Sequence, residues 1–295
     1  MMQLIVLSGA HHLLDNLKQI FPNVFTAEIK YFPDNELYLR FPFQIHEEVV
    51  IVQSIYKEPD KKLIELFFAS HNAKDLGAKK IFAFIPYLAY TRQDRRYKEG
   101  EAISQIITLK MIRDSGISSV LTFDAHFHAG IPKIENLNIM NVKLAPYFCS
   151  FFKEFANNEN FIAIGPDDDA YELATLLAKQ LGLESGFIEK KRLGDSEVEV
   201  KKCSVDVKNK NIILVDDMIS TGSTIIEAAK MLKNEGAKDI YVVATHGLFV
   251  ANSWDKLRSL ESIKKIICSN SIPNPAAYLD VSSIFRSYYE KWRNY

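Results

Sequence analysis

The feature that most constrains this chain is a series of short apolar runs separated by segments with helical periodicity. Several runs are continuously apolar rather than alternating, which suits strands buried on both faces of a parallel sheet. The helical segments 60–77 and 224–236 each close on a glycine, a residue typical of helix ends. The pattern predicts an α/β fold, a mainly parallel sheet flanked by helices. The expected strands are QLIVLSG, EVVIVQS, KKIFAFIPY and SSVLTFDAH in the first half, and NFIAIGPD, ESGFIEKKR, NIILVDD and DIYVVATHG in the second.

An internal repeat indicates that this pattern occurs twice. Residues 74–84 and 234–244 both read as a helix end, then Gly-Ala-Lys, then a buried strand. Gly-Ala-Lys before a strand is common enough for coincidence, but the match extends through strand, helix, cap and strand. We therefore predict two similar α/β domains with a boundary near residues 141–146, which gives domains of residues 1–144 and 145–295.

Composition excludes several classes of protein. The chain has 295 residues, a formal net charge of −1 and 47% hydrophobic residues, which gives no electrostatic reason to expect nucleic acid or a membrane surface as partner. The three cysteines, Cys149, Cys203 and Cys268, form no metal-ligand or disulfide spacing, and a reducing compartment suits them. With no signal peptide and no apolar run approaching about 20 residues, we expect a soluble cytoplasmic protein.

The adjacent carboxylates of Asp216 and Asp217, at the end of a buried strand, are the most informative pair in the sequence. They repel each other, and burial adds to that cost, so a bound group should offset it. The loop Ser220–Thr224 (STGST) follows and leads into a helix N-terminus, where unpaired N–H groups and hydroxyls favour a phosphate. Carboxylates accept hydrogen bonds from vicinal sugar hydroxyls, so the segment predicts a pentose phosphate site. The alternative is an acidic turn before a capped helix, although a cap needs no Asp-Asp pair.

Two segments of the first half carry charge next to aromatic residues. The loop at residues 86–104 sets four cations beside Tyr90 and Tyr97, which suits a purine base and its phosphates, although a solvated charged loop would look similar. The segment FPDNE at residues 32–36 reads, by itself, as a turn before a strand. The four cations of the loop are Arg92, Arg95, Arg96 and Lys98.

Three further segments hold candidate metal ligands or catalytic cations. Asp124, His126 and His128 alternate along TFDAHFHAG, and on an extended segment they would share one side. A lone histidine is usually structural; Asp-x-His at a strand end is a better metal candidate, although magnesium is a hard cation and seldom takes imidazole nitrogen. Asp167–Asp169 stand between a strand and a helix, where they would also favour the helix N-terminus. The run FIEKKRLGDSEVEV (187–200) leads from cations into an acidic hairpin.

These segments, taken in order, resemble those of the ribose-phosphate pyrophosphokinases, also called phosphoribosyl pyrophosphate synthetases. ILVDDMISTGST looks like the phosphoribosyl-pyrophosphate loop that this family shares with type I phosphoribosyltransferases. FPDNE, PYLAYTRQD, the DAH segment and the Lys-x-Arg loop resemble segments that the synthetases have in addition. The ending SEVEV is similar to archaeal-type members. The resemblance runs from about residue 3 to SIPNPAAYLDVSSIF near the C-terminus, with departures at Asn35, Ala125, Ala129 and Ser223.

The resemblance implies two phosphoribosyltransferase-type domains and an ATP-dependent transferase of nucleotide biosynthesis. Such an enzyme transfers the pyrophosphoryl group of ATP to the 1-hydroxyl of ribose 5-phosphate, with Mg²⁺ as cofactor. The implied roles are catalysis for Lys190 and Arg192; ATP binding for Asp34, Asn35, Glu36, Arg92, Gln93 and Asp94; ribose 5-phosphate binding for Arg192, Asp216, Asp217, Ser220, Thr221, Gly222, Ser223 and Thr224; and metal binding for His126, Asp167 and Asp124.

Two alternatives are compatible with part of this pattern. A phosphoribosyltransferase would use the same sugar-phosphate loop but would not need FPDNE or RQD. A non-catalytic subunit associated with the synthetase would keep the fold and lose the chemistry. Because the family assembles through paired subunits, we also expect a homo-oligomer, a dimer or larger, that binds ATP and ribose 5-phosphate and neither nucleic acid nor a membrane.

Overall fold

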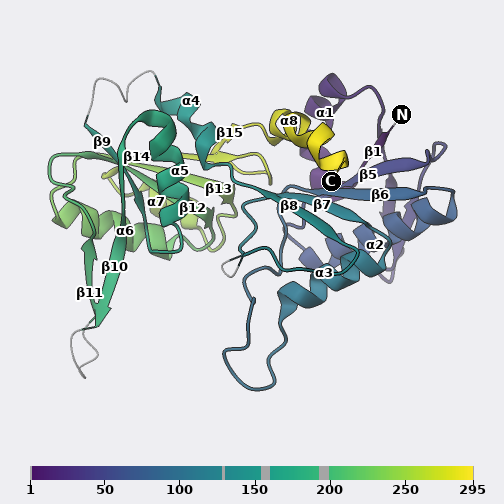
Figure 1. The fold of residues 1–295 in the computed structure, drawn as a ribbon, viewed down its shortest axis with the longest axis horizontal. Coiled ribbons are helices and arrows are strands. Elements are labelled where there is room, and N and C mark those ends of the chain that lie inside the picture. The colour runs from purple at the N-terminus through teal and green to yellow at the C-terminus, as the bar shows by residue number, and fades with distance from the viewer. Residues whose placement is uncertain (1, 128–129, 154–159, 193–198, 295) are drawn as a thin grey trace. The chain divides into compact units, whose positions relative to one another are not determined.

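The computed structural model describes residues 2–127, 130–153, 160–192 and 199–294. The chain divides into two compact units (Figure 1). Unit 1 comprises Met1–Val142 and Asp280–Tyr295, and unit 2 comprises Lys143–Leu279. Each unit is a mainly parallel sheet with helices packed against it, so the predicted fold class is confirmed.

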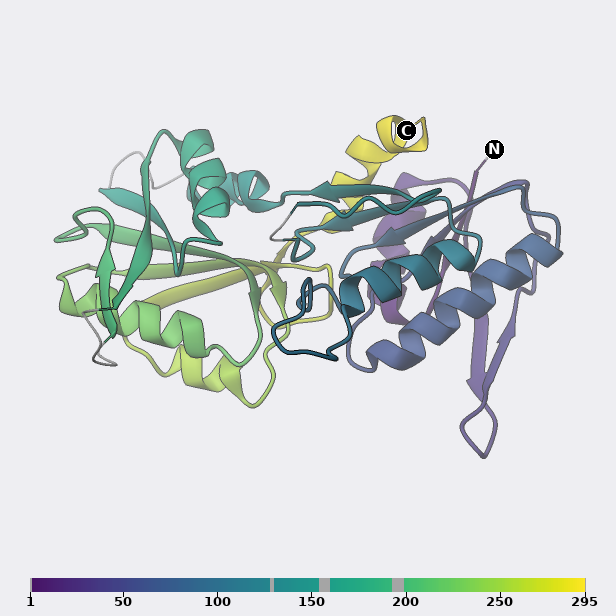
Figure 2. The same cartoon turned by 60° about the horizontal axis from the view of Figure 1, so that its bottom comes forward.

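The sheet of unit 1 has the strand order β2-β1-β5-β6-β7-β8, and every neighbouring pair is parallel. Its helices α2 and α3 lie on one face, as Figure 2 shows. A separate antiparallel hairpin consists of β3 (Glu28–Tyr31) and β4 (Leu37–Arg40). The sheet strands are β1 (Gln3–Val6), β2 (Val24–Thr26), β5 (Glu48–Val52), β6 (Lys80–Ile85), β7 (Ser119–Phe123) and β8 (Asn138–Val142). The helices are η1 (Ser8–Leu13), α1 (Leu14–Ile20), α2 (Pro59–Asp75), α3 (Ser104–Asp114) and α8 (Val281–Arg293).

The C-terminal helix α8 belongs to unit 1, which differs from the predicted domain of residues 145–295. The Phe285 ring stacks on Phe84 of β6 with centroids 4.1 Å apart. The Trp292 side chain is 0% exposed, and its ring packs on Phe82 of the same strand. The Arg293 guanidinium also donates a 2.7 Å hydrogen bond to Glu48. The apolar stripe of α8 therefore finishes the core of the first unit, a non-local contact that the order of the sequence does not reveal.

The sheet of unit 2 has the order β11-β10-β9-β12-β13-β14-β15, parallel throughout except for the antiparallel ribbon of β10 and β11. The strands β9, β12 and β13 are apolar and buried along most of their length, as predicted for a parallel sheet. They are β9 (Phe161–Gly165), β10 (Glu184–Arg192), β11 (Glu199–Cys203), β12 (Asn211–Ile219), β13 (Ile240–Gly247), β14 (Ile263–Ser269) and β15 (Ala277–Leu279). The helices are η2 (Ala145–Phe148), α4 (Cys149–Phe152), α5 (Tyr171–Leu181), α6 (Ser223–Asn234) and α7 (Ser253–Arg258).

The predicted repeat is confirmed by the strand order of the two sheets. The run β1-β5-β6-β7-β8 of unit 1 corresponds to β9-β12-β13-β14-β15 of unit 2. The register agrees at the level of residues. Phe84 and Val243 are equivalent, since each lies seven residues after the matching glycine, Gly77 or Gly236. Phe84 pairs with Val52 and Val243 pairs with Val215, so Val52 and Val215 are equivalent as well. Gln53 in unit 1 thus takes the place that Asp216 takes in unit 2.

The helix after this strand differs between the units. Gly77 and Gly236 end the two helices in the same way, with φ of 107° and 89°. Counting back from them, Ile64 corresponds to Ser223, the first residue of α6. Helix α2 has 17 residues and α6 has 12, so α2 starts about one turn earlier. Unit 1 therefore continues its helix where unit 2 has the Ser-Thr-Gly loop.

Within the described ranges, no helix is both long enough and apolar enough to cross a membrane. Cys203 and Cys268 are buried and Cys149 is partly exposed, and none of the three forms a disulfide.

Candidate active site

Asp216 and Asp217 lie near the carboxyl end of β12, at the edge where open α/β sheets bind ligands. The backbone N–H of Asp217 donates to the Asp216 carboxylate at 2.8 Å. Although the residue keeps some exposed surface, burial of its carboxyl, and then the charges of Asp217 and Asp167, raise the pKa of Asp216 well above its ordinary value. Three carboxylates, two on β12 and one in the turn after β9, therefore act on one another, and a bound cation or hydrogen-bond donor would relieve their repulsion.

The loop Ser220–Thr224 connects β12 to the first turn of α6. Gly222 has a φ of 75°, and a Cβ built on it would lie 3.2 Å from side-chain atoms of Leu257 and Ser253. Within this loop only Gly222 takes the left-handed conformation, and the φ of Ser223 is not positive. A serine at this position, one of the departures from the family pattern, therefore requires no left-handed backbone conformation.

The hydroxyls of this loop are held at the N-terminus of α6. The side chains of Thr221, Ser223 and Thr224 are exposed, and the Thr221 and Ser223 hydroxyls lie 3.1 Å apart. The carbonyl of Ser220 accepts hydrogen bonds from the Ser253 hydroxyl at 2.9 Å and the Val250 N–H at 3.1 Å, which fixes the start of the loop. The first N–H groups of α6 have no partner within the helix, so an anion of phosphate size would find donors there.

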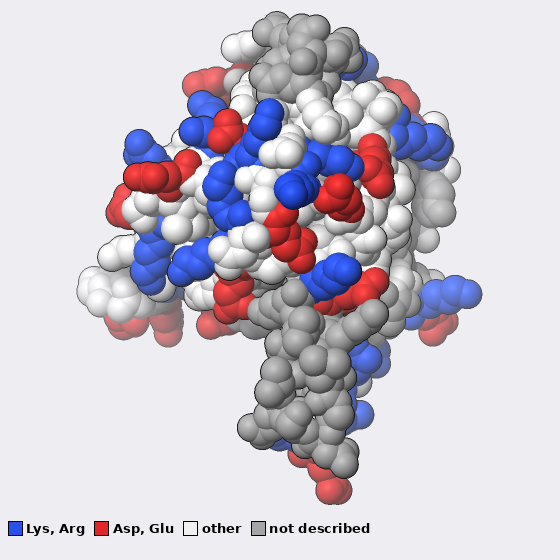
Figure 3. Space-filling model, turned by 90° about the vertical axis from the view of Figure 1, so that its left-hand side faces the viewer, with Lys and Arg blue, Asp and Glu red and all other residues white. Residues whose placement is uncertain are grey.

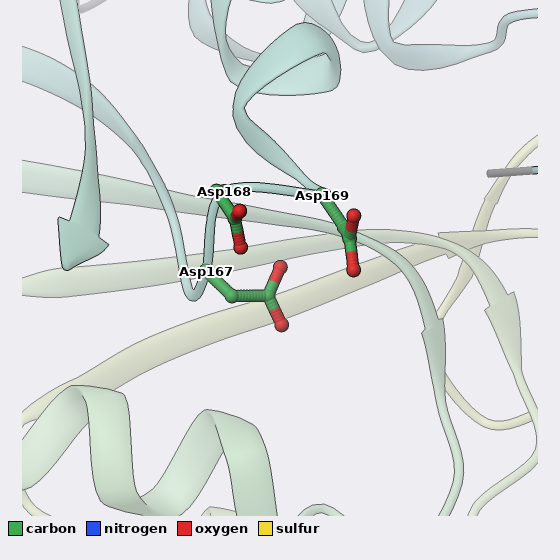
Figure 4. Close-up of side chains that lie close together, drawn as sticks. All are labelled: Asp167, Asp168 and Asp169. Carbon is green, nitrogen blue, oxygen red and sulfur yellow. The ribbon is translucent and has the colours of Figure 1, made fainter. Parts of the chain in front are cut away.

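Asp167, Asp168 and Asp169 form the turn between β9 and α5, and Figure 4 shows their carboxylates facing a common space. One oxygen from each lies within 4.8 Å of the other two. The Asp167 carboxylate also accepts a 3.1 Å hydrogen bond from the N–H of Ala170. A cluster of carboxylate oxygens suits a hard cation such as Mg²⁺. Of these three aspartates, the sequence implied a metal role for Asp167 alone; its two neighbours share the cluster and also precede the N-terminus of α5.

Lys190 and Arg192 end strand β10, whose backbone pairs with β11. Lys190 is opposite Lys201 and Arg192 is opposite Glu199. The side chains of Lys190 and Arg192 lie outside the described part of the structure, as does the connecting segment 193–198. Their catalytic role stays a prediction.

The segment FPDNE forms the tip of the β3–β4 hairpin in unit 1. Asn35 has a φ of 68°, and its N–H donates to Phe32 O at 2.8 Å. The N–H of Glu36 donates to the Asp34 carboxylate at 3.2 Å. Asparagine tolerates the left-handed conformation better than other non-glycine residues, which explains why it can replace the family's glycine here. Asp34, Asn35 and Glu36 are all exposed.

The arginine-rich loop after β6 is held by an acidic residue that sequence reasoning missed. The Glu101 carboxylate accepts hydrogen bonds from the N–H groups of Tyr97 at 2.8 Å and Lys98 at 3.0 Å, and from the Gln93 amide at 3.1 Å. These two backbone hydrogen bonds, Lys98 first, hold the pKa of Glu101 below its ordinary value. The available signal was an acid that closes a basic run, RRYKEGE.

Within this loop, the predicted ATP contacts differ in accessibility. Arg92 is exposed. Gln93 is partly buried, and its amide also donates to Arg95 O at 3.0 Å. The Asp94 side chain is 4% exposed and lies 3.6 Å from the Arg95 guanidinium, so it faces the interior of the loop. An ATP contact by Asp94 stays a prediction.

The predicted arrangement of Asp124 and His126 on one side of an extended segment is wrong. Asp124 has a φ of 35° and is 1% exposed, whereas His126 is partly exposed. The Asp124 N–H still bonds to β8, at Val142 O, and the chain leaves the sheet after it, where the Asn141 side chain bonds both the N–H and the C=O of Ala125. His128 and Ala129 lie outside the described residues. The predicted metal ligands are divided between the units, with Asp124 and His126 in unit 1 and Asp167 in unit 2.

Charge on the face shown in Figure 3 is mixed, with Lys and Arg side chains interspersed among Asp and Glu. Such a surface lacks the one-sign field typical of nucleic-acid binding. The expected absence of nucleic-acid and membrane partners stays a prediction.

Comparison with known proteins extends over nearly the whole chain. Residues 2–116 match the N-terminal domain of ribose phosphate pyrophosphokinase, and residues 135–280 match the phosphoribosyl transferase domain. The chain is 36% identical to a ribose-phosphate pyrophosphokinase of Pyrococcus abyssi over 93% of both chains. It is 37% identical to that of Sulfurisphaera tokodaii over 88% of both. In fold it is similar to the crystal structure of phosphoribosylpyrophosphate synthetase from Mycobacterium smegmatis, with a TM-score of 0.85, 23% identity, and coverage of 98% of this chain and 99% of the other.

Two parallel-sheet units, one of which carries an acidic pair followed by a Ser-Thr-Gly loop, define a protein with two phosphoribosyltransferase-type domains. The chain belongs to the ribose-phosphate pyrophosphokinase family. The two relatives named above are of the archaeal type that the ending SEVEV resembles.

Proposed function

We propose that this protein is a ribose-phosphate diphosphokinase. The 1-hydroxyl of ribose 5-phosphate attacks the β-phosphorus of ATP, the bond between the α,β-bridging oxygen and the β-phosphorus breaks, and AMP leaves. The observation that carries this proposal is the joining of Asp216 and Asp217 at the end of β12 to the glycine-containing hydroxyl loop of α6. Family membership over almost the whole chain supports the ATP-dependent reaction rather than a simple phosphoribosyl transfer.

Ribose 5-phosphate binds in unit 2. Its phosphate accepts hydrogen bonds from the N–H groups at the start of α6 and from the exposed hydroxyls of Thr221, Ser223 and Thr224. Its vicinal hydroxyls donate to Asp216 and Asp217, which holds the sugar in one orientation for attack. Ser220 and Gly222 shape the loop, and Arg192 adds positive charge.

ATP contacts come from two segments of unit 1. The hairpin tip offers Asp34, Asn35 and Glu36 as exposed polar groups, and the loop after β6 offers Arg92 and Gln93, with Asp94 beneath them. An exposed guanidinium is suited to phosphate, because it donates two parallel hydrogen bonds to adjacent oxygens.

Mg²⁺ fits the acidic donor set of unit 2. Asp167, with Asp168 and Asp169 close by, supplies the oxygen ligands that this cation prefers, and the raised pKa of Asp216, caused by burial and by the charges of Asp217 and Asp167, marks a place where added positive charge is favourable. When bound, the ion draws negative charge away from the polyphosphate. His126 and Asp124 remain proposed ligands from unit 1.

Lys190 and Arg192 complete the proposed site. The reaction concentrates negative charge on the transferred group and on the leaving AMP, and cations that close over it lower the barrier. The resemblance of residues 187–192 to the family's Lys-x-Arg segment supports this role.

The protein acts as a homo-oligomer, at least a dimer, in the cytoplasm. Four large apolar side chains are exposed on the helices that cover one face of unit 1 (Figure 2): Ile64 and Phe68 on α2, and Ile107 and Met111 on α3. Each pair is four residues apart and so lies on one side of its helix, which suits an interface with a second copy. Unpaired cysteines suit a reducing compartment.

Phosphorus NMR of the purified protein with Mg²⁺, ATP and ribose 5-phosphate tests the function. Matched appearance of AMP and a sugar-linked diphosphate is the expected result. Intact ATP, with and without added inorganic phosphate, would overturn it and favour a phosphoribosyltransferase or a non-catalytic subunit. Sedimentation of the wild type against Phe68→Asp tests the oligomer.

A further inference from the structure

In unit 1, the position equivalent to the sugar-phosphate site is filled by the protein's own side chains. Gln53 corresponds to Asp216, and Ser8 follows β1 as Asp167 follows β9. Both neutral side chains donate to one carboxylate, that of Glu65 in α2, from Ser8 Oγ at 2.5 Å and Gln53 Nε2 at 2.8 Å. Asp216 and Asp167 of unit 2 are thus replaced in unit 1 by two donors, which bind an internal carboxylate.

Glu65 is 0% exposed and hydrogen-bonded on both oxygens. Lys62, from the additional turn of α2, donates to Glu65 Oε1 at 3.0 Å and to Ser8 Oγ at 2.5 Å. Burial alone would raise the pKa of Glu65, but hydrogen bonds from Ser8, Lys62 and Gln53 hold it below its ordinary value. Moving any of these donors away would leave the buried charge unpaired, so the side chains around the ionised Glu65 carboxylate are held in fixed positions.

The hairpin that carries FPDNE is hydrogen-bonded to this Glu65 carboxylate. Tyr31, the last residue of β3, donates its hydroxyl to Glu65 Oε1 at 2.9 Å. Its ring also lies below the Lys61 ammonium, 5.4 Å from the ring centroid. Tyr31 shares a face of the hairpin with Ile29, which packs on the core, and the predicted ATP contacts begin three residues later.

We propose that Tyr31, through its hydrogen bond to Glu65, positions the hairpin tip Asp34–Glu36 for nucleotide binding. This inference rests on the proposed function, in which that tip contacts ATP. The hairpin is a two-stranded sheet, which has little stability of its own, so its orientation depends on such side-chain anchors. A charge-assisted hydrogen bond from the base of the tip restricts the hairpin before ATP arrives, and so lowers the entropy lost on binding. Tyr31 is a positioning residue rather than a ligand of ATP.

Tyr31→Phe removes the hydroxyl and keeps the ring. Tyr38→Phe is the matched control, because Tyr38 is in the same hairpin on β4, opposite Lys30, and lies on the other face. We expect Tyr31→Phe to weaken the affinity for MgATP about tenfold, measured by calorimetry without ribose 5-phosphate, and to raise KM for ATP equally. kcat and KM for ribose 5-phosphate should not change, and Tyr38→Phe should behave as wild type.

Hydrogen exchange of the ligand-free protein separates the anchor from the reaction. Faster exchange confined to residues 28–40 in Tyr31→Phe supports the anchor, and unchanged exchange there overturns it. Faster exchange with an unchanged affinity for MgATP overturns the positioning role. If the wild type makes no AMP, the proposed function fails, and the calorimetry and exchange still decide this inference.

Discussion

Gln53 and Asp216 take the same place in the two units: Gln53 directly follows β5, and Asp216 lies at the equivalent position of β12. The Gln53 amide donates to buried Glu65, whereas burial and the charges of Asp217 and Asp167 raise the pKa of the Asp216 carboxyl. One copy of the repeat satisfies this position internally, and the other leaves it for a ligand. That difference explains how one fold supplies a structural support in unit 1 and the proposed sugar-phosphate site in unit 2.

Asp216→Asn should stabilise the ligand-free protein while removing activity. The pKa of Asp216 is raised by burial, then by Asp217 and Asp167, so the folded state holds this proton more tightly than the unfolded state. Stability of the wild type therefore falls as pH rises above the ordinary value of 3.8 toward the folded pKa. At neutral pH we expect the variant to melt a few degrees higher, as about 1 kcal/mol would produce, and kcat/KM to fall by about two orders of magnitude.

Thermal melting of both proteins at several pH values checks this prediction. The gain in melting temperature should shrink at acidic pH, where Asp216 is protonated in both states. A variant that melts lower than the wild type at neutral pH would contradict it.

Lys190→Ala should lower kcat by about two to three orders of magnitude, because it removes a cation from the transition state. The affinity for ribose 5-phosphate should change little. Lys202→Ala is the control, since Lys202 is an exposed cation on the paired strand β11, opposite Glu189. Steady-state kinetics by AMP release measures both variants; equal losses in the two would point to a general charge effect instead.

Glu101→Gln should disorder the arginine-rich loop and raise KM for ATP about five- to tenfold. The pKa of Glu101 is lowered by the N–H groups of Lys98 and Tyr97, so its contribution is present above the ordinary value of 4.5 and is lost as pH falls through the folded pKa. KM for ATP of the wild type should therefore rise at acidic pH toward that of the variant. Glu99→Gln, on an exposed neighbour, is the control, and an unchanged KM in Glu101→Gln would refute the loop's dependence on this carboxylate.

Gly222→Ala should weaken binding of ribose 5-phosphate about tenfold and cost about 1 kcal/mol of stability. The φ of 75° is unfavourable for alanine, and the added Cβ would lie 3.2 Å from Leu257 and Ser253, so the loop must shift. Gly182→Ala is the matched control, with a φ of 67° and open space around its Cβ. Calorimetry should show both variants destabilised, Gly222→Ala the more because of the added contacts, and a loss of ribose 5-phosphate affinity in Gly222→Ala only.

Trp292→Ala should destabilise unit 1 by about 3–5 kcal/mol, the usual cost of removing a large buried side chain. Trp292 is 0% exposed and packs on Phe82 of β6, so the cavity would open beside that strand. Native-state hydrogen exchange should accelerate in β6 and not in β13 of unit 2. Lys291→Ala, an exposed change in the same turn, should leave both strands protected.

Much of the fold follows from local patterns. The expected strands are all present, because continuous apolar runs of strand length have few other stable arrangements in an α/β chain. The loop that joins β12 to α6 was also predictable, since strand, acidic pair, loop and helix follow one another without interruption. The arrangement of Asp124 and His126 was not, because the chain leaves the sheet at Asp124, whose φ is 35°, and the Asn141 side chain then holds Ala125 where alternation suggested a straight segment.

The sequence by itself determined the two parallel-sheet units, the repeat between them and the loop at the start of α6, all of which depend on residues close together in the chain. Only the tertiary structure decided that α8 completes unit 1, that Asp167 acts on Asp216, and that Tyr31 is bonded to Glu65. These relationships join segments distant in sequence, and their energies depend on burial and on which side chains meet. Periodicity and spacing describe what a segment can form, whereas packing selects its partners.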